Sequence, residues 1–174
     1  MPRSTHEHPP PEHFVRNATI REVRLPEDEP AILSFLHGLQ DYEAAFEPNR
    51  RRDPEWAVEH WRESQHRVAE RHGIMLIAEQ DGRPVGWAMA YDARSELFVV
   101  ESERHHGYLA ELFVAPEARG KGHGRALMEA CAAWGRERGH KVLMVGVQSP
   151  NTLAIRSYEA AGFAPYALTM RRYL

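Results

Sequence analysis

The sequence predicts an α/β fold, in which helices flank a mixed sheet within one domain. Three observations support this: three segments with apolar residues at helical spacing, several short strand-like runs, and an Asp81–Gly82 pair typical of a hairpin turn. A length of 174 residues suits a single domain. We place that domain at residues 17–174, after a flexible, proline-rich tail at residues 1–16.

The N-terminal tail is polar and contains three consecutive prolines, Pro9 to Pro11. Proline removes a backbone donor and favours an extended chain, so we expect a mobile arm. Three histidines lie in it: His6, His8 and His13. They could bind a metal ion, but we favour a solvated tail and predict no metal site.

The domain is expected to begin with a strand and two helices. Residues 18–23 alternate in polarity as a half-buried strand does. Asp28 is suited to cap a helix with Pro30 in its first turn, and apolar residues then repeat at helical spacing, at Ile32, Phe35, Leu36 and Leu39. Asp53 marks a second helix start, followed by a looser apolar stripe at Ala57, Val58, Trp61 and Val68.

Strands are expected in the middle of the chain. Residues 74–78 and 84–90 predict a hairpin around the Asp81–Gly82 turn. Residues 97–100 are a third strand-like run, which either extends or follows the hairpin. Residues 108–114 predict a further strand.

The C-terminal third alternates helix and strand. Helical spacing returns at Ala126, Leu127, Ala130, Cys131 and Trp134, and Gly139 is placed to end that helix. Residues 141–147 are mostly apolar, as in a strand buried on both faces. Asn151 is suited to cap a last helix, which Gly162 is placed to stop. Residues 166–173 are predicted to close the chain as a strand.

Composition argues against several classes of protein. A formal net charge of −3 disfavours dedicated nucleic-acid binding, which needs a basic excess. No apolar run is long enough to span a bilayer, and the N-terminus lacks the apolar core of a signal peptide. The single cysteine, Cys131, cannot form an internal disulfide. We therefore expect a cytoplasmic protein with no nucleic-acid or membrane partner.

The most informative segment joins a strand to a helix through three glycines. The strand ends at Val114, and Gly120, Gly122 and Gly124 precede the helix. A helix start offers unpaired N–H groups and the positive end of the helix dipole, and glycine lets the backbone approach phosphate oxygens closely. Positive charges lie nearby, on Arg119, Lys121 and Arg125. The pattern favours a pyrophosphate ligand.

Two other phosphate-binding loops fit less well. The Rossmann fingerprint needs G-x-G-x-x-G and a later acidic ribose partner, and the three glycines do not supply that spacing. The Walker loop needs Ser or Thr after its lysine, whereas Gly122 follows Lys121. A glycine-rich turn with no ligand is the plain structural alternative, which the flanking strand and helix make less favoured.

Two motifs resemble those of the GNAT superfamily of acetyl-CoA-dependent N-acetyltransferases. The first is a strand ending in L-x-V and then R-x-x-G-x-G at a helix start, matched by Leu112, Val114, Arg119, Gly122 and Gly124. The second is residues 151–163, NTLAIRSYEAAGF. The resemblance covers the chain well from residue 108 onward and loosely before it. It implies a single GNAT-like domain with a mixed, mostly antiparallel central sheet, acetyl-CoA as co-substrate and no metal.

The resemblance also implies how acetyl-CoA would be held. Backbone groups of the strand would pair with the pantetheine arm as though it were an added strand. N–H groups of residues 119–124 would hold the pyrophosphate, and Asn151 would either bind pantetheine or serve as a plain helix cap. The full predicted set is Leu112, Phe113, Val114, Arg119, Gly120, Lys121, Gly122, His123, Gly124, Arg125, Asn151 and Tyr158.

Acetyl transfer to an amine needs an oxyanion donor, a group that serves the departing thiolate, and a neutral amine. A backbone N–H of residues 112–114 suits the oxyanion. Tyr158 stands where the family usually keeps a tyrosine that protonates the thiolate. A tyrosine pKa of about 10 against about 8.5 for a thiol makes that transfer uphill by roughly 2 kcal/mol, so hydrogen bonding to sulfur is an alternative role. A core tyrosine is the plain alternative.

A general base is harder to choose. Glu111 lies within the cofactor strand and could accept the amine's proton or anchor a cationic acceptor. Some members of the family use no dedicated base. Four further residues precede the strand, and we favour a solvated loop for them: Glu101, Glu103, His105 and His106.

The predicted acceptor is a primary amine of a small molecule. Residues 38–48 carry carboxylates beside aromatic rings, which suits an ammonium group, although ordinary surface charge is the interpretation that we favour: Asp41, Tyr42, Glu43, Phe46 and Glu47. A protein N-terminus or lysine is the alternative acceptor. An acetyl-CoA-sensing module is the non-enzyme alternative, against which Tyr158 argues. The apolar residues 167–174, near an expected sheet edge, predict a homodimer.

Overall fold

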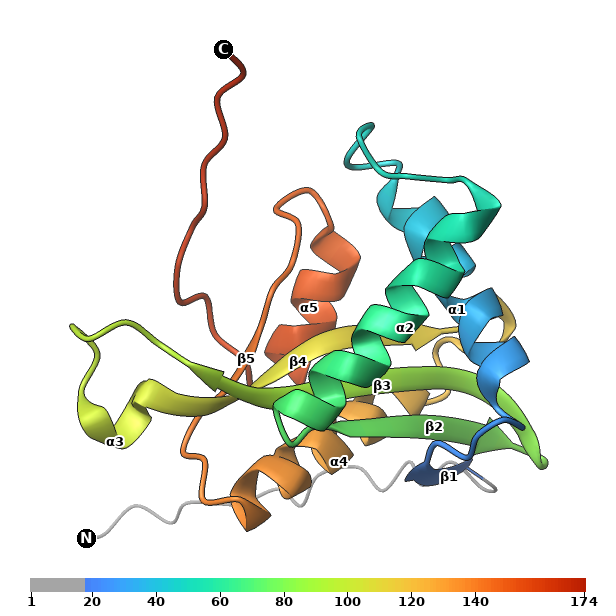
Figure 1. Ribbon diagram of the computed structural model, residues 1–174, viewed down its shortest axis with the longest axis horizontal. Coiled ribbons are helices and arrows are strands. Elements are labelled where there is room, and N and C mark those ends of the chain that lie inside the picture. The colour runs from blue at the N-terminus through green and yellow to red at the C-terminus, as the bar shows by residue number, and fades with distance from the viewer. Residues whose placement is uncertain (1–17) are drawn as a thin grey trace, which may run out of the picture.

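A five-stranded sheet organises the chain (Figure 1). The computed structural model describes residues 18–174, so the predicted tail and its three histidines lie outside the described residues. The strands β1 (Ala18–Glu22), β2 (Ile74–Gln80), β3 (Arg83–Arg94) and β4 (His105–Val114) are antiparallel neighbours, and β5 (Leu143–Val145) joins β4 in parallel. The predicted α/β domain with a mixed, mostly antiparallel sheet is confirmed.

Helices cover both faces of this sheet (Figure 1). On one face, α1 (Glu29–Glu43) and α2 (Pro54–Glu70) pack over β3; on the other face lies α4 (His123–Glu137). A hydrophobic core lies on each face of the sheet, and alternate residues of β3 point into one or the other. Trp87 and Met89 face α1 and α2, whereas Ala88 and Ala90 face α4. The remaining helices are the short α3 (Glu101–Arg104), the 3₁₀ turn η1 (Pro116–Ala118) and α5 (Thr152–Ala160).

The predicted hairpin turn is confirmed, and its backbone shows why these residues make it. Asp81 and Gly82 both have positive φ, of 52° and 73°. Two successive residues in this region match the tight turn whose twist suits a hairpin, and Asp–Gly tolerates it well. Cys131, one of the residues predicted at helical spacing, is free and buried in α4.

Two predicted helix caps are wrong, although both helices are present. Neither Asp28 nor Asp53 caps its helix with its side chain. The Asp28 carboxylate instead accepts hydrogen bonds from the Arg21 guanidinium at 2.6 and 2.8 Å, which holds the pKa of Asp28 below its usual range. Asp53 is bound by Arg51 in the same way. A guanidinium offers two charge-assisted bonds, which are stronger than one bond from a neutral N–H.

Three strand predictions also need correction. Residues 97–100 form an exposed loop before α3, in which Phe98 is 87% exposed. The predicted strand at 141–147 is reduced to Leu143–Val145 and is only half-buried, because β5 is the last strand of the described sheet. Residues 166–173 form no strand and leave the body of the molecule (Figure 1). An alternating sequence pattern is typical of a strand, but the backbone N–H and C=O groups of the segment must still pair with a neighbouring strand.

Candidate functional site

β4 carries a bulge that separates its two halves. Glu111 pairs with Met89 and Leu109 with Ala90, so Ala110 is the extra residue. Before the bulge, residues 107–109 pair with β5; beyond it, residues 110–114 face no strand of the described chain on that edge. The predicted cofactor strand, 112–114, therefore has a backbone edge open to an added strand-like ligand. One of its groups, the Val114 carbonyl, accepts a hydrogen bond from Arg119 Nε at 3.0 Å.

The glycine loop continues this open edge. Gly120 and Gly122 have φ of 74° and 86°, a region that residues with a Cβ disfavour. Gly122 is the N-cap residue just before α4, and no described side chain caps that helix, so its first N–H groups are unpaired within the described chain. A Cβ at Gly120 would meet nothing within 4 Å. The loop thus combines outward N–H groups, the positive helix end and free space, which together fit a phosphate.

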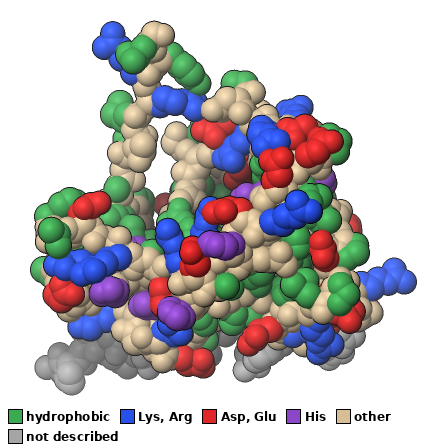
Figure 2. All heavy atoms as spheres, in the orientation of Figure 1, with side chains coloured by type: hydrophobic (Ala, Val, Ile, Leu, Met, Phe, Trp, Pro, Cys, Tyr) green, Lys and Arg blue, Asp and Glu red, His purple; other side chains and the backbone are tan. Residues whose placement is uncertain are grey.

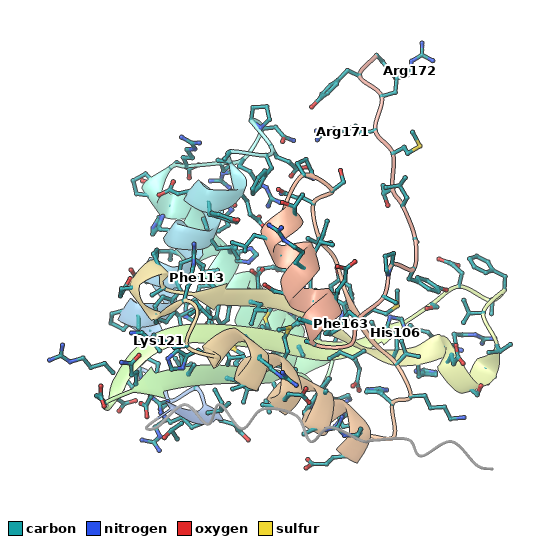
Figure 3. All side chains as sticks on the ribbon, turned by 180° about the vertical axis from the view of Figure 1, so that it is seen from behind. His106, Phe113, Lys121, Phe163, Arg171 and Arg172 are labelled. Carbon is teal, nitrogen blue, oxygen red and sulfur yellow. The ribbon has the colours of Figure 1, made fainter. Side chains whose placement is uncertain are left out.

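Two side chains of this loop lie near the last residue of β2. Lys121 Nζ and His123 Nε2 both lie near Gln80 Oε1, at 3.4 and 3.2 Å, and Figure 3 shows Lys121 on the loop at the start of α4. The His123 imidazole is buried, and burial together with Lys121 lowers its pKa. His123 can therefore offer a phosphate its backbone N–H, while its ring packs inward. Arg125 is exposed.

The end of α1 lies against the other side of the open edge. The Tyr42 hydroxyl donates to Asn151 Oδ1 at 3.3 Å, and the Arg119 guanidinium lies 5.3 Å from the centre of the Tyr42 ring. Asn151 Oδ1 also accepts from the Ala154 N–H at 3.1 Å, which confirms the predicted cap of α5. Gln148 Nε2 donates to Glu47 Oε2 at 2.9 Å. These contacts bring residues far apart in sequence together beside the open edge of β4, and we use the name slot for that edge and the residues along it.

Carboxylates gather at the other end of the slot. Glu43 and Glu47 are both bound by Arg50, at 2.9 and 3.1 Å. Burial raises the pKa of Glu43, the charge of Arg50 opposes that rise, and the negative charge of Glu111 adds to it. Asp41 is exposed, which agrees with the interpretation of the acidic residues in 38–48 as ordinary surface charge.

Tyr158 of α5 joins this acidic end. Burial raises the pKa of Tyr158 to about 12, with further contributions from Glu43, Glu111 and Tyr108. The ring of Phe163 packs edge-on against it at 5.7 Å. Tyr158 of α5 thus lies within electrostatic reach of Glu111, which follows the bulge of β4.

One residue of the site was missed by sequence reasoning. His60 Nε2 lies 2.8 Å from Glu111 Oε1, and the His60 ring stacks on Trp56 with centroids 5.1 Å apart and planes at 16°. The only signal in the sequence was the four-residue spacing of Trp56 and His60, which places them on one face of a helix.

The four alternative bases are not brought to this end. Glu101 and Glu103 are exposed on α3, and His105 is exposed where β4 begins. His106, predicted to be solvated, is buried, and its Nδ1 lies 3.1 Å from the Arg104 carbonyl oxygen and 3.3 Å from Ser95 Oγ. Figure 3 shows it away from Phe113, which lies beyond the bulge.

Residues 18–174 contain neither a candidate metal site nor a membrane-spanning helix. Within that range, no group of three or more His, Cys, Asp or Glu side chains is arranged to hold a metal ion. None of the helices there combines the length and apolarity needed to cross a membrane.

Comparison with known proteins gives a consistent set of matches. Residues 36–163 match the family model described as the acetyltransferase (GNAT) family. The chain is 31% identical over 97 residues to an N-acetyltransferase of Bacillus subtilis, covering 56% of this chain and 62% of the relative. It is 35% identical over 98 residues to a mycothiol acetyltransferase of Thermobispora bispora, covering 53% of this chain and 30% of the relative.

A solved structure shares the fold over most of the chain. The aminoglycoside N-acetyltransferase AAC(6')-Iy, in complex with CoA, superposes with a TM-score of 0.65 at 20% identity, covering 91% of this chain and 95% of that one. By contrast, the matches to the two curated relatives span less than two thirds of their length.

Proposed function

We propose a specific reaction for this chain, which belongs to the GNAT family of acetyltransferases and is therefore an acyltransferase. The proposed reaction moves the acetyl group of acetyl-CoA directly to a primary amine of a small molecule. The observation that carries the proposal is the slot beside β4. One end has an open strand edge and an uncapped helix start, and the other has two carboxylates and a tyrosine.

The residues present fit acetyl-CoA as co-substrate, which the CoA bound to AAC(6')-Iy also supports. Backbone groups of Leu112 to Val114 would pair with pantetheine, and N–H groups from Arg119 to Gly124 would hold the pyrophosphate. Asn151 already accepts two hydrogen bonds through Oδ1, so a contact with pantetheine would use its NH₂ group.

Glu111 is proposed as the base. The attacking amine is neutral, having given its first proton to solvent. Glu111 takes a second proton from it as the new C–N bond forms, and a backbone N–H beyond the bulge stabilises the developing oxyanion. The C–S bond then breaks, and the thiolate leaves beside Tyr158. With the Tyr158 pKa raised to about 12, complete proton transfer to a thiolate of pKa about 8.5 would be uphill by about 5 kcal/mol. Tyr158 therefore serves the sulfur by hydrogen bonding, and the thiolate takes its final proton from solvent.

The acceptor is proposed to be a cationic small molecule. Glu43 and Glu111 place negative charge at the end of the slot where the amine would lie, with the Tyr158 ring beside them. The similarity to a mycothiol acetyltransferase and to an aminoglycoside N-acetyltransferase supports small-molecule acceptors. A protein N-terminus or lysine is the second candidate, and the exposed hydrophobic residues of the 97–100 loop are the surface that would favour it.

A panel of amines tests this proposal. Purified protein with acetyl-CoA is offered mono- and polyamines, amino sugars and peptides, and free thiol is measured. We expect cationic small amines to exceed lysine peptides and free peptide N-termini by about tenfold or more in kcat/KM. Preference for peptides would contradict the acceptor class, and tight acetyl-CoA binding with no turnover would instead support the sensing module.

A homodimer is part of the same proposal, as is a cytoplasmic location, for which the free Cys131 argues. Figure 2 shows hydrophobic side chains along the C-terminal segment, where Tyr166, Leu168 and Met170 alternate and are 72–86% exposed. Such a row suits a strand edge of a second copy, and β5 has one neighbour in the described sheet. Light scattering at micromolar concentration is expected to give twice the monomer mass; a monomer mass would contradict the proposal.

A further inference from the structure

We infer that His60 positions Glu111 for proton abstraction, through the hydrogen bond between His60 Nε2 and Glu111 Oε1. The inference rests on the proposed function, because it assigns a role to a residue that acts through the proposed base. The 2.8 Å separation is that of a strong hydrogen bond. Both side chains are mostly shielded, with exposures of 25% for His60 and 14% for Glu111.

The His60 ring is itself held by its surroundings. Trp56, one helical turn earlier in α2, stacks on the imidazole with nearly parallel planes. The Trp56 ring in turn meets His37 of α1 edge-on at 6.4 Å. A ring fixed in plane by stacking can rotate little, so its Nε2 stays directed at β4.

Glu111 needs such a partner because of where it lies. It follows the bulge of β4, where the regular pairing is interrupted at Ala110. A glutamate side chain has three rotatable bonds, and holding it in one conformation costs entropy. A hydrogen bond to Oε1 removes that freedom and leaves Oε2 available to the amine. A displacement of about 1 Å in a reacting group can lower a rate about a hundredfold.

His60 is also partly open to solvent. It lines a shallow hollow of about 220 Å³ on the outer side of α2, together with Arg51, Trp56, Glu59 and Glu63. Figure 2 shows this face of the molecule covered with mixed charges. Arg51 is paired with Asp53 and Glu59, and Glu63 with Arg67, so the charges around the hollow are largely neutralised by their own partners.

The competing explanation is that the pair only fastens α2 to the sheet. In that case losing the hydrogen bond would lower stability, and kcat would change little in either background. A positioning residue acts solely through the group that it positions. The two explanations therefore differ in a double-mutant cycle.

The experiment measures kcat and acetyl-CoA affinity in wild type, His60→Leu, His60→Gln, Glu111→Gln and the double variant His60→Leu/Glu111→Gln. Leucine keeps bulk without a donor, and the glutamine amide carries an N–H near the position of Nε2. His66→Leu, at an exposed site on the same helix, is the matched control. We expect His60→Leu to lower kcat about tenfold to a hundredfold with unchanged acetyl-CoA affinity, and His60→Gln to recover most of it.

In the Glu111→Gln background we expect His60→Leu to have no further effect on kcat. The inference is overturned if His60→Leu keeps wild-type kcat, if it costs the same factor in both backgrounds, or if His60→Gln is as slow as His60→Leu. Failure of the proposed function has a different signature, since wild type itself then acetylates no amine, and the inference is rejected together with it.

Discussion

The two ends of the slot beside β4 are built from different kinds of group. The glycine loop offers backbone N–H groups and the left-handed conformations of Gly120 and Gly122, within one continuous stretch of chain. At the acidic end, side chains from separate elements converge, chiefly Glu43 of α1, Glu111 of β4 and Tyr158 of α5.

This difference predicts how each end responds to mutation. A backbone site is insensitive to most side-chain changes but sensitive to any Cβ that fills its space or opposes its φ. A side-chain site depends on the charge and hydroxyl groups themselves. The glycine loop should therefore control affinity for acetyl-CoA, and the acidic end should control turnover and the choice of amine.

The largest expected effect is that of Glu111→Gln. Loss of a general base typically costs about 100-fold to 10,000-fold, and we expect a fall of about 100-fold in kcat. Glutamine retains an oxygen that can accept from His60, so the fold should persist. Acetyl-CoA affinity, measured by calorimetry, should not change. A fall in acetyl-CoA affinity along with kcat would contradict the assignment of cofactor binding to the glycine loop and turnover to the acidic end.

A pair of alanine variants tests the glycine loop. Gly120 and Gly82 have nearly the same φ, 74° and 73°, and at both a Cβ would meet nothing within 4 Å. Alanine therefore introduces similar strain at each, of about 1–2 kcal/mol. Only Gly120→Ala should weaken acetyl-CoA binding, by about tenfold. If the two variants were folded, had equal melting temperatures and bound acetyl-CoA with equal affinity, the glycine loop would not be part of the cofactor site.

Tyr158→Phe should have a smaller effect on turnover. A hydrogen bond to a charged group is worth about 1.5–3 kcal/mol, so we expect kcat to fall by about tenfold or somewhat more. Since the Tyr158 pKa is raised to about 12, its proton is lost only as pH rises through that value. The pH profile of wild type should thus show no basic limb from Tyr158 below about pH 10. A basic limb near pH 9 that disappears in Tyr158→Phe would contradict this.

The smallest expected effect belongs to Glu43→Gln. Removing one partly exposed carboxylate should raise KM for a cationic amine by roughly fivefold, with kcat nearly unchanged. Because burial raises the pKa of Glu43, its charge is lost at a higher pH than for an ordinary glutamate as pH falls. In wild type KM should rise as pH falls through that raised pKa, and Glu43→Gln should lack this rise. An unchanged KM would make Glu43 a structural partner of Arg50.

The sequence by itself determined the features that depend on neighbouring residues. The hairpin turn at Asp81–Gly82, the helical periods, the cap at Asn151 and the strand–loop–helix around Gly122 are all set within a few residues. Their signals are backbone conformations and short-range hydrogen bonds, which local chemistry controls. For that reason the sequence alone was enough to find the family resemblance, whose motifs lie within residues 112–124 and 151–163.

Tertiary structure alone decided the features that need a distant partner. Glu111 meets His60 across 51 residues, and Arg21 takes Asp28 away from the helix that it was predicted to cap. Residues 166–173 have the pattern of a strand but no strand beside them in the described chain. Apolar pattern and residue type state what a segment can do, whereas packing determines which groups lie within hydrogen-bond reach of each other.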